Sequence, residues 1–144
     1  MSVNHVLVAT DGSENATVAV RWAGELAAQT GSRVTAVHVF EPLAHLSGTG
    51  PLDLAELREV VRRELHDRWC APLVTLGIEH DAEVLEGKPA AAIADAASKL
   101  GADLIVIGAR GLSSVRCVVL GSTSQRLPHI TSVPVVIVSL ADER

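Results

Sequence analysis

The sequence of 144 residues contains few aromatic residues and few cysteines, and these absences limit the classes of protein that it can encode. Aromatic residues make up 2% of the chain and tyrosine is missing, although 48% of the residues are hydrophobic. A core at this size must therefore consist mainly of Val, Leu, Ile and Ala side chains. The two cysteines, Cys70 and Cys117, are too far apart in sequence to form a metal-binding pair, which favours a reduced protein of the cytoplasm.

Long apolar runs and an excess of positive charge are also absent. No run approaches the roughly 18 apolar residues of a membrane span, and the N-terminus MSVNH lacks a basic segment followed by a long apolar one. We therefore expect neither a membrane span nor a signal peptide. The formal net charge of −5 argues against nonspecific binding to nucleic acid, so we expect no nucleic-acid partner. The length suits one domain, which we expect to cover residues 1–144.

Apolar runs that are typical of buried strands alternate with segments of helical spacing. Strands are expected over residues 6–9, 33–40, 78–85, 104–107 and 133–139. Helices are expected over residues 14–29, from about 54 to 69, over 90–100 and from 122 onward. Pro72 should kink or end the second helix, and Leu127-Pro128 should interrupt the last one. The alternation predicts an α/β protein with a mainly parallel sheet and helices on both of its faces.

The most informative stretch covers residues 108–124 and reads GARGLSSVRCVVLGSTS. It follows the apolar run 104–107, and its glycines at 108, 111 and 121 allow sharp turns and the close approach of a ligand. The segment GSTS at its end could open a helix, whose free N–H groups attract anions. The stretch could therefore close around phosphate groups, although a plain glycine-rich surface loop before a capped helix explains the same pattern.

Two familiar phosphate-binding motifs are absent from the chain. GxGxxG fails because Val106 stands where a further glycine is needed. The lysine-containing phosphate loop fails because Gly87-Lys88 is followed by Pro89, and Ala82 stands in place of its first glycine. No GxSxG, HExxH or CxxC motif supports a hydrolase or a transferase. What remains is the spacing G-x2-G-x9-G-S.

The spacing Gly108-x2-Gly111-x9-Gly121-Ser122 resembles the ATP-binding signature of the universal stress protein family. The starting segment VLVATDGS, the segment GKP at 87–89 and the closing segment VPVVIV are similar to the same family, so the resemblance covers nearly the whole chain. It implies an open five-stranded parallel sheet of order 3-2-1-4-5, a Rossmann-like adenine-nucleotide-binding fold. In this order strands one and four are neighbours at the switch point, where open sheets bind ligands.

By this resemblance, ATP with Mg²⁺ would bind in a crevice between strands one and four. Asp11 would hydrogen-bond the ribose or help to place the metal, because a carboxylate accepts from hydroxyls; a plain role at the start of a helix is the alternative. The backbone of Val39 would meet adenine, unless Val39 is only strand core. Gly108 and Gly111 would let the loop pass near the ribose and the phosphates.

The phosphates themselves would be held at the start of the last helix. Gly121, Ser122 and Thr123 would donate N–H and hydroxyl groups, and Arg110 either pairs with a phosphate or is a solvated surface residue. No catalytic residue and no metal-binding cluster is predicted. The complete predicted nucleotide site consists of Ala9, Thr10, Asp11, Val39, Gly108, Arg110, Gly111, Gly121, Ser122, Thr123 and Ser124.

We expect bound ATP to be turned over very slowly, because the stretch 108–124 contains no Asp, Glu or His that could activate water. His38, inside the second strand, is interpreted as a core or edge histidine rather than a catalyst. The resemblance thus implies a stress-response sensor or signalling module, not a fast enzyme. Two alternatives remain, namely a member of the family that binds cyclic AMP and a slow ATP hydrolase. A hydrolase or transferase of the wider adenine-nucleotide-binding fold is a further alternative, but the chain contains none of the catalytic motifs named above. A protein that keeps the fold only for interaction, without a nucleotide, is disfavoured by the intact glycine spacing.

Members of the family pair through the last strand, which implies a homodimer through residues 133–139. The sequence VPVVIVS in this segment places apolar residues on both faces of a strand that would otherwise be an exposed edge.

Overall fold

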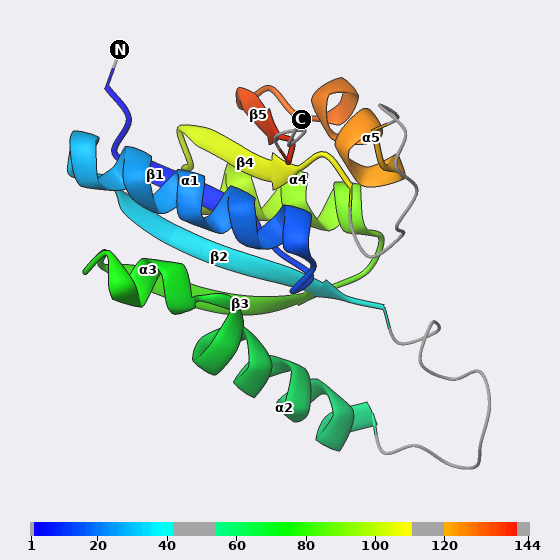
Figure 1. Ribbon diagram of the computed structural model, residues 1–144. Helices are drawn as coiled ribbons and strands as arrows, with labels where there is room; N and C mark the ends of the chain where they lie inside the picture. The colour runs from blue at the N-terminus through cyan, green and yellow to red at the C-terminus, as the bar shows by residue number, and fades with distance from the viewer. Residues whose placement is uncertain (1, 42–53, 111–119, 141–144) are drawn as a thin grey trace.

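Figure 1 shows the computed structural model, which describes residues 2–41, 54–110 and 120–140. Five parallel strands form one sheet in the order β3-β2-β1-β4-β5. The strands are β1 (His5–Ala9), β2 (Arg33–Phe40), β3 (His80–Glu86), β4 (Leu104–Gly108) and β5 (Val135–Val138). The predicted α/β class and the predicted strand order are therefore confirmed.

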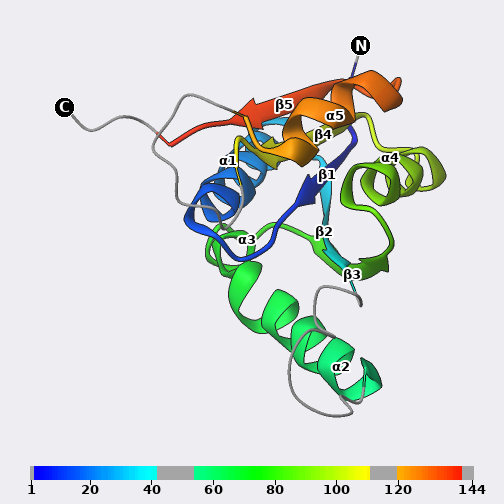
Figure 2. The same cartoon turned by 90° about the vertical axis from the view of Figure 1, so that its right-hand side faces the viewer.

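Helices cover both faces of this sheet, as Figure 2 shows. They are α1 (Glu14–Thr30), α2 (Leu54–Glu64), the π-helix η2 (Leu65–Trp69), α3 (Ala71–Thr75), α4 (Pro89–Leu100) and α5 (Ser122–Ile130). Successive side chains of a strand point to opposite faces, so β1 contributes to two core clusters. Val6 and Val8 pack with α1, η2 and α3, whereas Leu7 and Ala9 pack with α4 and α5.

Helix α1 begins and ends at residues whose chemistry suits each position. The Oγ atom of Ser13 accepts a hydrogen bond from the N–H of Ala16, at 3.2 Å, and so satisfies one free donor of the first turn. Gly31 ends the helix in the left-handed conformation, with φ +73°, and its N–H donates to the carbonyl of Ala27. These caps fix where α1 starts, directly after the carboxyl end of β1.

The chain between β2 and β3 departs from the single helix that the sequence predicts. Helix α2 passes into η2, and Pro72 lies in the first turn of a separate short helix, α3, that the pattern did not predict. A proline in the first turn loses no hydrogen bond, because the N–H group there has no helical acceptor. Cys70, between η2 and α3, is fully buried, and burial raises the pKa of its thiol to about 11. The thiol therefore stays protonated at neutral pH and is a packing group.

The last helix continues where the sequence predicted an interruption. Helix α5 runs through Pro128 and ends at Ile130. Pro128 lies in the last turn, so the helix loses only the one bond that would reach the Ser124 carbonyl. Leu127 beside it is fully buried and packs with α4, which favours the helical conformation. Strand β5 is shorter than the predicted 133–139, and Pro134 precedes it.

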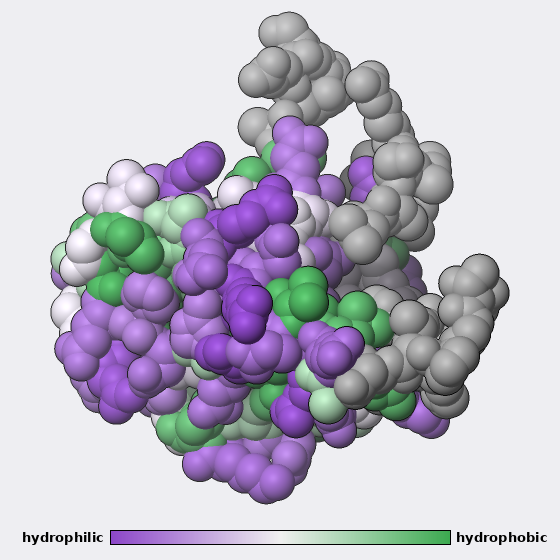
Figure 3. All heavy atoms as spheres, turned by 90° about the horizontal axis from the view of Figure 1, so that it is seen from below, coloured by the Kyte–Doolittle hydropathy of each residue, from purple (hydrophilic) through white to green (hydrophobic). Residues whose placement is uncertain are grey.

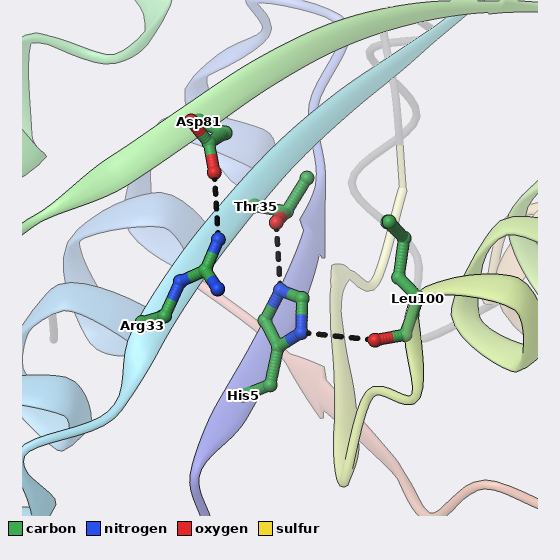
Figure 4. A network of polar contacts seen from close by, with 5 residues as sticks. All are labelled: His5, Arg33, Thr35, Asp81 and Leu100. Atoms are coloured by element: carbon green, nitrogen blue, oxygen red, sulfur yellow. Dashed lines mark hydrogen bonds and ion pairs between the residues drawn. The ribbon is translucent and has the colours of Figure 1, made fainter.

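The amino ends of the strands are joined by polar contacts, drawn in Figure 4. His5 of β1 lies between the carbonyl of Leu100, 3.2 Å from Nδ1, and the hydroxyl of Thr35 on β2, 2.7 Å from Nε2. A carbonyl only accepts, so Nδ1 donates to Leu100, while Nε2 shares a hydrogen bond with the Thr35 hydroxyl. An exposed ion pair between Arg33 and Asp81 links β2 to β3. These contacts lie at the end of the sheet opposite to the carboxyl ends of the strands.

The described surface is mostly hydrophilic on the side where α2 projects, with small separate apolar areas (Figure 3). Helix α2 has no buried residue and carries a hydrogen-bonded pair, Arg62 with Glu59. The guanidinium of Arg62 holds the pKa of Glu59 below its ordinary value. Within residues 2–41, 54–110 and 120–140, no helix is long and apolar enough to cross a membrane.

Helix α1 approaches β4 so closely that only glycine fits at the end of this strand. A Cβ atom on Gly108 would lie 2.9 Å from the carbonyl oxygen of Asn15 and 3.2 Å from the N atom of Ala16. The missing side chain therefore lets the first turn of α1 rest against the carboxyl end of β4. The sequence assigned Gly108 to ligand contact; the structure shows that it is also needed for helix packing.

We expect Gly108→Ala to lower the free energy of unfolding by about 1–3 kcal/mol, because the added methyl group overpacks backbone that cannot move aside. Urea unfolding checks this expectation. Gly121→Ala is the matched control, since its Cβ atom would lie 3.4 Å from the nearest backbone atoms and its φ of −65° suits any residue. Equal stability of the two variants would contradict the packing explanation.

Candidate functional site

The carboxyl ends of β1 and β4 open into a cavity, because these two strands pair directly while helices α1 and α5 pack on opposite faces of the sheet. The cavity, called here the switch-point pocket, has a volume of about 620 Å³. The predicted site residues that line it are Ala9, Thr10, Asp11, Val39, Gly108, Arg110, Gly121, Ser122, Thr123 and Ser124. Gly111, also predicted, lies outside the described residues. The structure therefore brings together the predicted residues that it describes, while their role in binding stays a prediction.

Asp11 is fixed at the point where β1 passes into α1. Its Oδ1 atom accepts a hydrogen bond from the N–H of Ser13, at 2.9 Å. The N–H of Thr10 donates to the carbonyl of Val37 on β2, which holds the end of β1 against its neighbour. Among the residues that the structure describes, no partner occupies the second carboxylate oxygen of Asp11. This oxygen is available to accept from a ligand hydroxyl or to bind a cation.

The first turn of α5 forms the opposite wall of the pocket. Its N-cap, Gly121, offers no side-chain acceptor, and the turn contains no acidic residue. The N–H groups of Ser122, Thr123 and Ser124 have no acceptor within the helix, because the first helical bond runs from Gln125 to the Gly121 carbonyl. Free N–H groups and the helix dipole together make this end of the pocket attractive to an anion.

Two groups of the predicted nucleotide site are already engaged within the protein. The N–H of Gly121 donates to the carbonyl of Ala109, at 2.7 Å. The Oγ atom of Ser124 lies 2.8 Å from the same carbonyl, and Ser124 is 2% exposed. Both groups hold the start of α5 against the end of β4. At the start of α5 this leaves the N–H groups of Ser122, Thr123 and Ser124 and the hydroxyls of Ser122 and Thr123 as donors for a ligand.

Gly121 does not use the conformational freedom that the sequence analysis assigned to glycine. Its φ of −65° and ψ of 164° are open to any residue. A Cβ atom there would lie 3.4 Å from the Ala109 carbonyl oxygen and from Cα of Arg110. The expected sharp turn is therefore wrong for Gly121, and what the missing side chain provides is space at the wall of the pocket.

Arg110 carries an unsatisfied donor at the pocket wall. Its Nη1 atom is buried, and within the described part of the chain it has no hydrogen-bond partner. Buried side-chain donors are normally paired, so an unpaired guanidinium nitrogen is an exception that needs a reason. A bound anion would supply the missing acceptor, since a guanidinium pairs well with phosphate or carboxylate oxygens.

The pocket wall also contains a second group of residues, which the sequence did not predict. They are Ala16, Val37, His38, Glu41, Val61, Trp69, Pro89, Ile93 and Ile107. His38 was interpreted as a core or edge residue, yet it lines the pocket, with Nδ1 donating to the Thr10 carbonyl at 2.9 Å. Because His38 lies near the carboxyl end of β2, the strand next to β1, its place on the pocket wall could have been predicted. Nothing in the spacing of Val61 and Trp69 separates them from ordinary helix residues.

The acidic residues on the pocket wall do not form a metal centre. Asp11 and Glu41 are the carboxylates among the described lining residues. Within the described ranges no group of three or more His, Cys, Asp or Glu residues could hold a metal ion. A magnesium ion held by one or two carboxylates and by phosphate oxygens is compatible with this arrangement.

A family model and the sequences of curated proteins both match this chain to universal stress proteins. The model of the universal stress protein family matches residues 2–139. A universal stress protein of Thermus aquaticus is 38% identical over 133 residues, which cover 92% of this chain and 96% of the relative. One of Methanocaldococcus jannaschii is 30% identical and covers 92% of this chain and 80% of the relative.

Solved structures share the fold over nearly the full length. A universal stress protein in complex with cAMP is 25% identical, with a TM-score of 0.72 and coverage of 98% of this chain and 100% of its own. A universal stress protein from Archaeoglobus fulgidus in complex with dAMP is 26% identical, with a TM-score of 0.70 and coverage of 96% and 99%. Since the family model spans residues 2–139 and a relative is 38% identical over nearly its whole length, the chain belongs to the universal stress protein family.

Proposed function

We propose that the protein binds ATP in the switch-point pocket and acts in the cytoplasm as a stress sensor or signalling module. The observation that carries this proposal is the set of unsatisfied donors at one end of the pocket, namely the first turn of α5 and Nη1 of Arg110. The volume of about 620 Å³ lies within the range of small-molecule and cofactor sites. The related proteins whose complexes contain cAMP and dAMP support an adenine nucleotide as the ligand.

The polarity of the pocket suggests one orientation of the nucleotide. Phosphates belong against α5 and Arg110, where donors and positive charge gather. Asp11 lies on the wall formed by β1 and can accept from a ribose hydroxyl or hold Mg²⁺ that accompanies the phosphates. The backbone of Val39 stays our candidate for the contact to adenine. Mg²⁺ would reduce the negative charge of the phosphates and so lessen their repulsion from Asp11.

Cyclic AMP is the second candidate ligand, and the complex of a 25% identical relative with cAMP favours it specifically. A cyclic phosphate carries one negative charge, whereas the triphosphate of ATP carries several. The helix dipole of α5 and the positive charge of Arg110 both stabilise negative charge at this end of the pocket, and a triphosphate carries more of it. This difference in charge is why we place ATP first.

We further propose that turnover is slow and that the protein works as a homodimer through β5. The first turn of α5, against which we place the phosphates, contains no Asp, Glu or His that could activate water. In the described sheet β5 is an edge strand, and Val135, Val136, Ile137 and Val138 are half-buried within one protomer. A second copy could cover this edge.

ATP with Mg²⁺ should raise the melting temperature, because a ligand at 100 times its dissociation constant adds about 2.7 kcal/mol to the native state. Arg110→Ala should weaken ATP binding about 10- to 100-fold, as expected for a hydrogen bond to a charged group. Differential scanning fluorimetry and calorimetric titration measure the two effects. Arg126→Ala on the exposed part of α5 is the control and should bind like the wild type.

The stability of the unliganded Arg110→Ala protein sharpens this test. Removing a buried donor that has no partner should not lower the melting temperature in the absence of nucleotide. The ATP proposal would be contradicted if millimolar ATP leaves the melting temperature unchanged and the purified protein contains no bound nucleotide. A melting temperature that rises with cyclic AMP but not with ATP would favour cyclic AMP as the ligand.

Phosphate release from bound ATP should be far slower than the enzyme median of about 10 per second. The reason is that binding groups are present while an oriented base beside the phosphates is not part of the proposed site. A single-turnover assay with purified protein and Mg²⁺ measures the rate. Release within seconds that disappears in Asp11→Ala or His38→Ala would place the protein among the enzymes.

Val136→Lys should shift the protein from dimer to monomer, because it places a charge on the apolar edge strand. Sedimentation at micromolar concentration measures the state, and the melting temperature shows whether the variant is folded. Glu83→Lys on β3, at the opposite edge of the sheet, should leave the dimer intact. A monomeric wild-type protein would remove the basis of the dimer proposal.

A further inference from the structure

Trp69 is an aromatic side chain in a pocket that otherwise has aliphatic and polar walls. The chain contains one Phe, two Trp and no Tyr. Among the described residues that line the switch-point pocket, Trp69 and His38 are the two with aromatic rings. A chain with so few aromatic residues thus places one of its two tryptophans at the proposed ligand site.

The π-helix η2 explains how Trp69 reaches the pocket. The N–H of Cys70 donates to the Leu65 carbonyl, five residues earlier, at 3.1 Å. In an α-helix these two residues would lie about 140° apart around the axis. The wider turn lets both Leu65 and Cys70 become fully buried in the core, and it places Trp69 at the border between core and pocket. Such single π-turns occur frequently at functional sites.

Two neighbours hold the indole ring in place. A Cβ atom on Gly12 would lie 2.5 Å from Cε2 and from Nε1 of Trp69, so the indole rests against backbone that only glycine leaves open. Gly12 also has a φ of +79°, which favours glycine. The ring of His38 meets the indole edge to face, with ring centres 5.0 Å apart. The hydrogen bond from His38 Nδ1 to the Thr10 carbonyl fixes the histidine in turn.

The part of the pocket beside Trp69 is unfavourable for phosphate. Asp11 directly precedes Gly12, against which the indole rests, so one carboxylate lies close to the aromatic pair, and Glu41 is a second carboxylate on the pocket wall. The free donors lie at the start of α5, which Figure 2 shows on the other side of β1 from α2 and α3. A nucleotide with its phosphates against α5 would therefore direct its flat, uncharged base toward Trp69.

We propose that Trp69, positioned by Gly12 and His38, contacts the aromatic base of the bound nucleotide and determines the affinity for the nucleoside part. This inference rests on the proposed nucleotide binding. An aromatic side chain in contact with a base typically contributes an effect of about 5- to 150-fold in affinity. The contact would also change the surroundings of the indole, which makes Trp69 a reporter of occupancy.

Fluorescence tests the contact directly. Trp22 on α1 is not among the pocket residues, so Trp22→Phe leaves Trp69 as the sole tryptophan without touching the site. Saturating ATP, and adenosine at higher concentration, should quench or shift the Trp69 emission of this variant. Unchanged emission while calorimetry shows bound ATP would overturn the inference and leave the proposed function intact.

Two substitutions separate base contact from space filling. Trp69→Phe keeps an aromatic face, whereas Trp69→Leu keeps apolar bulk beside Gly12 without a π surface. Trp69→Leu should lose about 5- to 150-fold in affinity for ATP and for adenosine by the same factor. Trp69→Phe should retain most of the affinity. Melting temperatures without ligand show that both variants are folded.

The outcomes distinguish this inference from the proposal on which it rests. Equal ATP affinity in wild type, Trp69→Phe and Trp69→Leu would show that Trp69 is only a packing residue. Equal losses in the two variants would assign it a structural role and also overturn the inference. A wild-type protein that binds neither ATP, adenosine nor cyclic AMP would overturn the proposed function itself, whatever the variants do.

Discussion

The direct parallel pairing of β1 with β4 is the constraint on which the rest of the structure depends. Val6, Leu7 and Val8 pair with Leu104, Ile105 and Val106. The order of strands along the sheet reverses at this pair, so helices α1 and α5 lie on opposite faces of the sheet and leave a cavity between them. Had β1 and β4 been apart in the sheet, Asp11 and the start of α5 would not face a common pocket.

Glycine at two positions lets other elements come close to this point. Gly108 allows the first turn of α1 to rest on the end of β4, and Gly12 leaves room for the indole of Trp69. Neither role depends on a ligand. The same two residues nevertheless shape the pocket wall, because α1 and η2 are held within reach of it. Packing and site geometry are therefore joined, and a substitution at either glycine changes both.

The sequence predicted the sheet and the glycine-lined half of the site, because both depend on local patterns. Buried parallel strands appear as apolar runs, and the start of α5 appears as glycine followed by hydroxyl residues. The half of the site that contains His38 and Trp69 depends on contacts between segments that are distant in sequence. The hydrophobic periodicity of each segment carries no information about such contacts. The π-turn at Cys70 is a tertiary effect, since burial of both Leu65 and Cys70 favours it. The continuation of α5 through Pro128 has a similar origin in the burial of Leu127, which outweighs one lost bond.

The unsatisfied donors of the pocket link folding to ligand binding. A buried polar group without a partner destabilises the native state, yet Nη1 of Arg110 is held in this condition, and the first-turn N–H groups of α5 beside it have no acceptor within the helix. Gly121 and Ser124 anchor the start of α5 through the Ala109 carbonyl, so the free donors cannot turn away to find partners of their own. An anion that enters the pocket therefore meets donors already oriented, and it also removes the energetic cost of leaving Arg110 unpaired. Part of the binding free energy in such a site therefore comes from pairing a donor that the unliganded fold leaves unpaired. A ligand bound in this way raises the free energy of unfolding of the native protein.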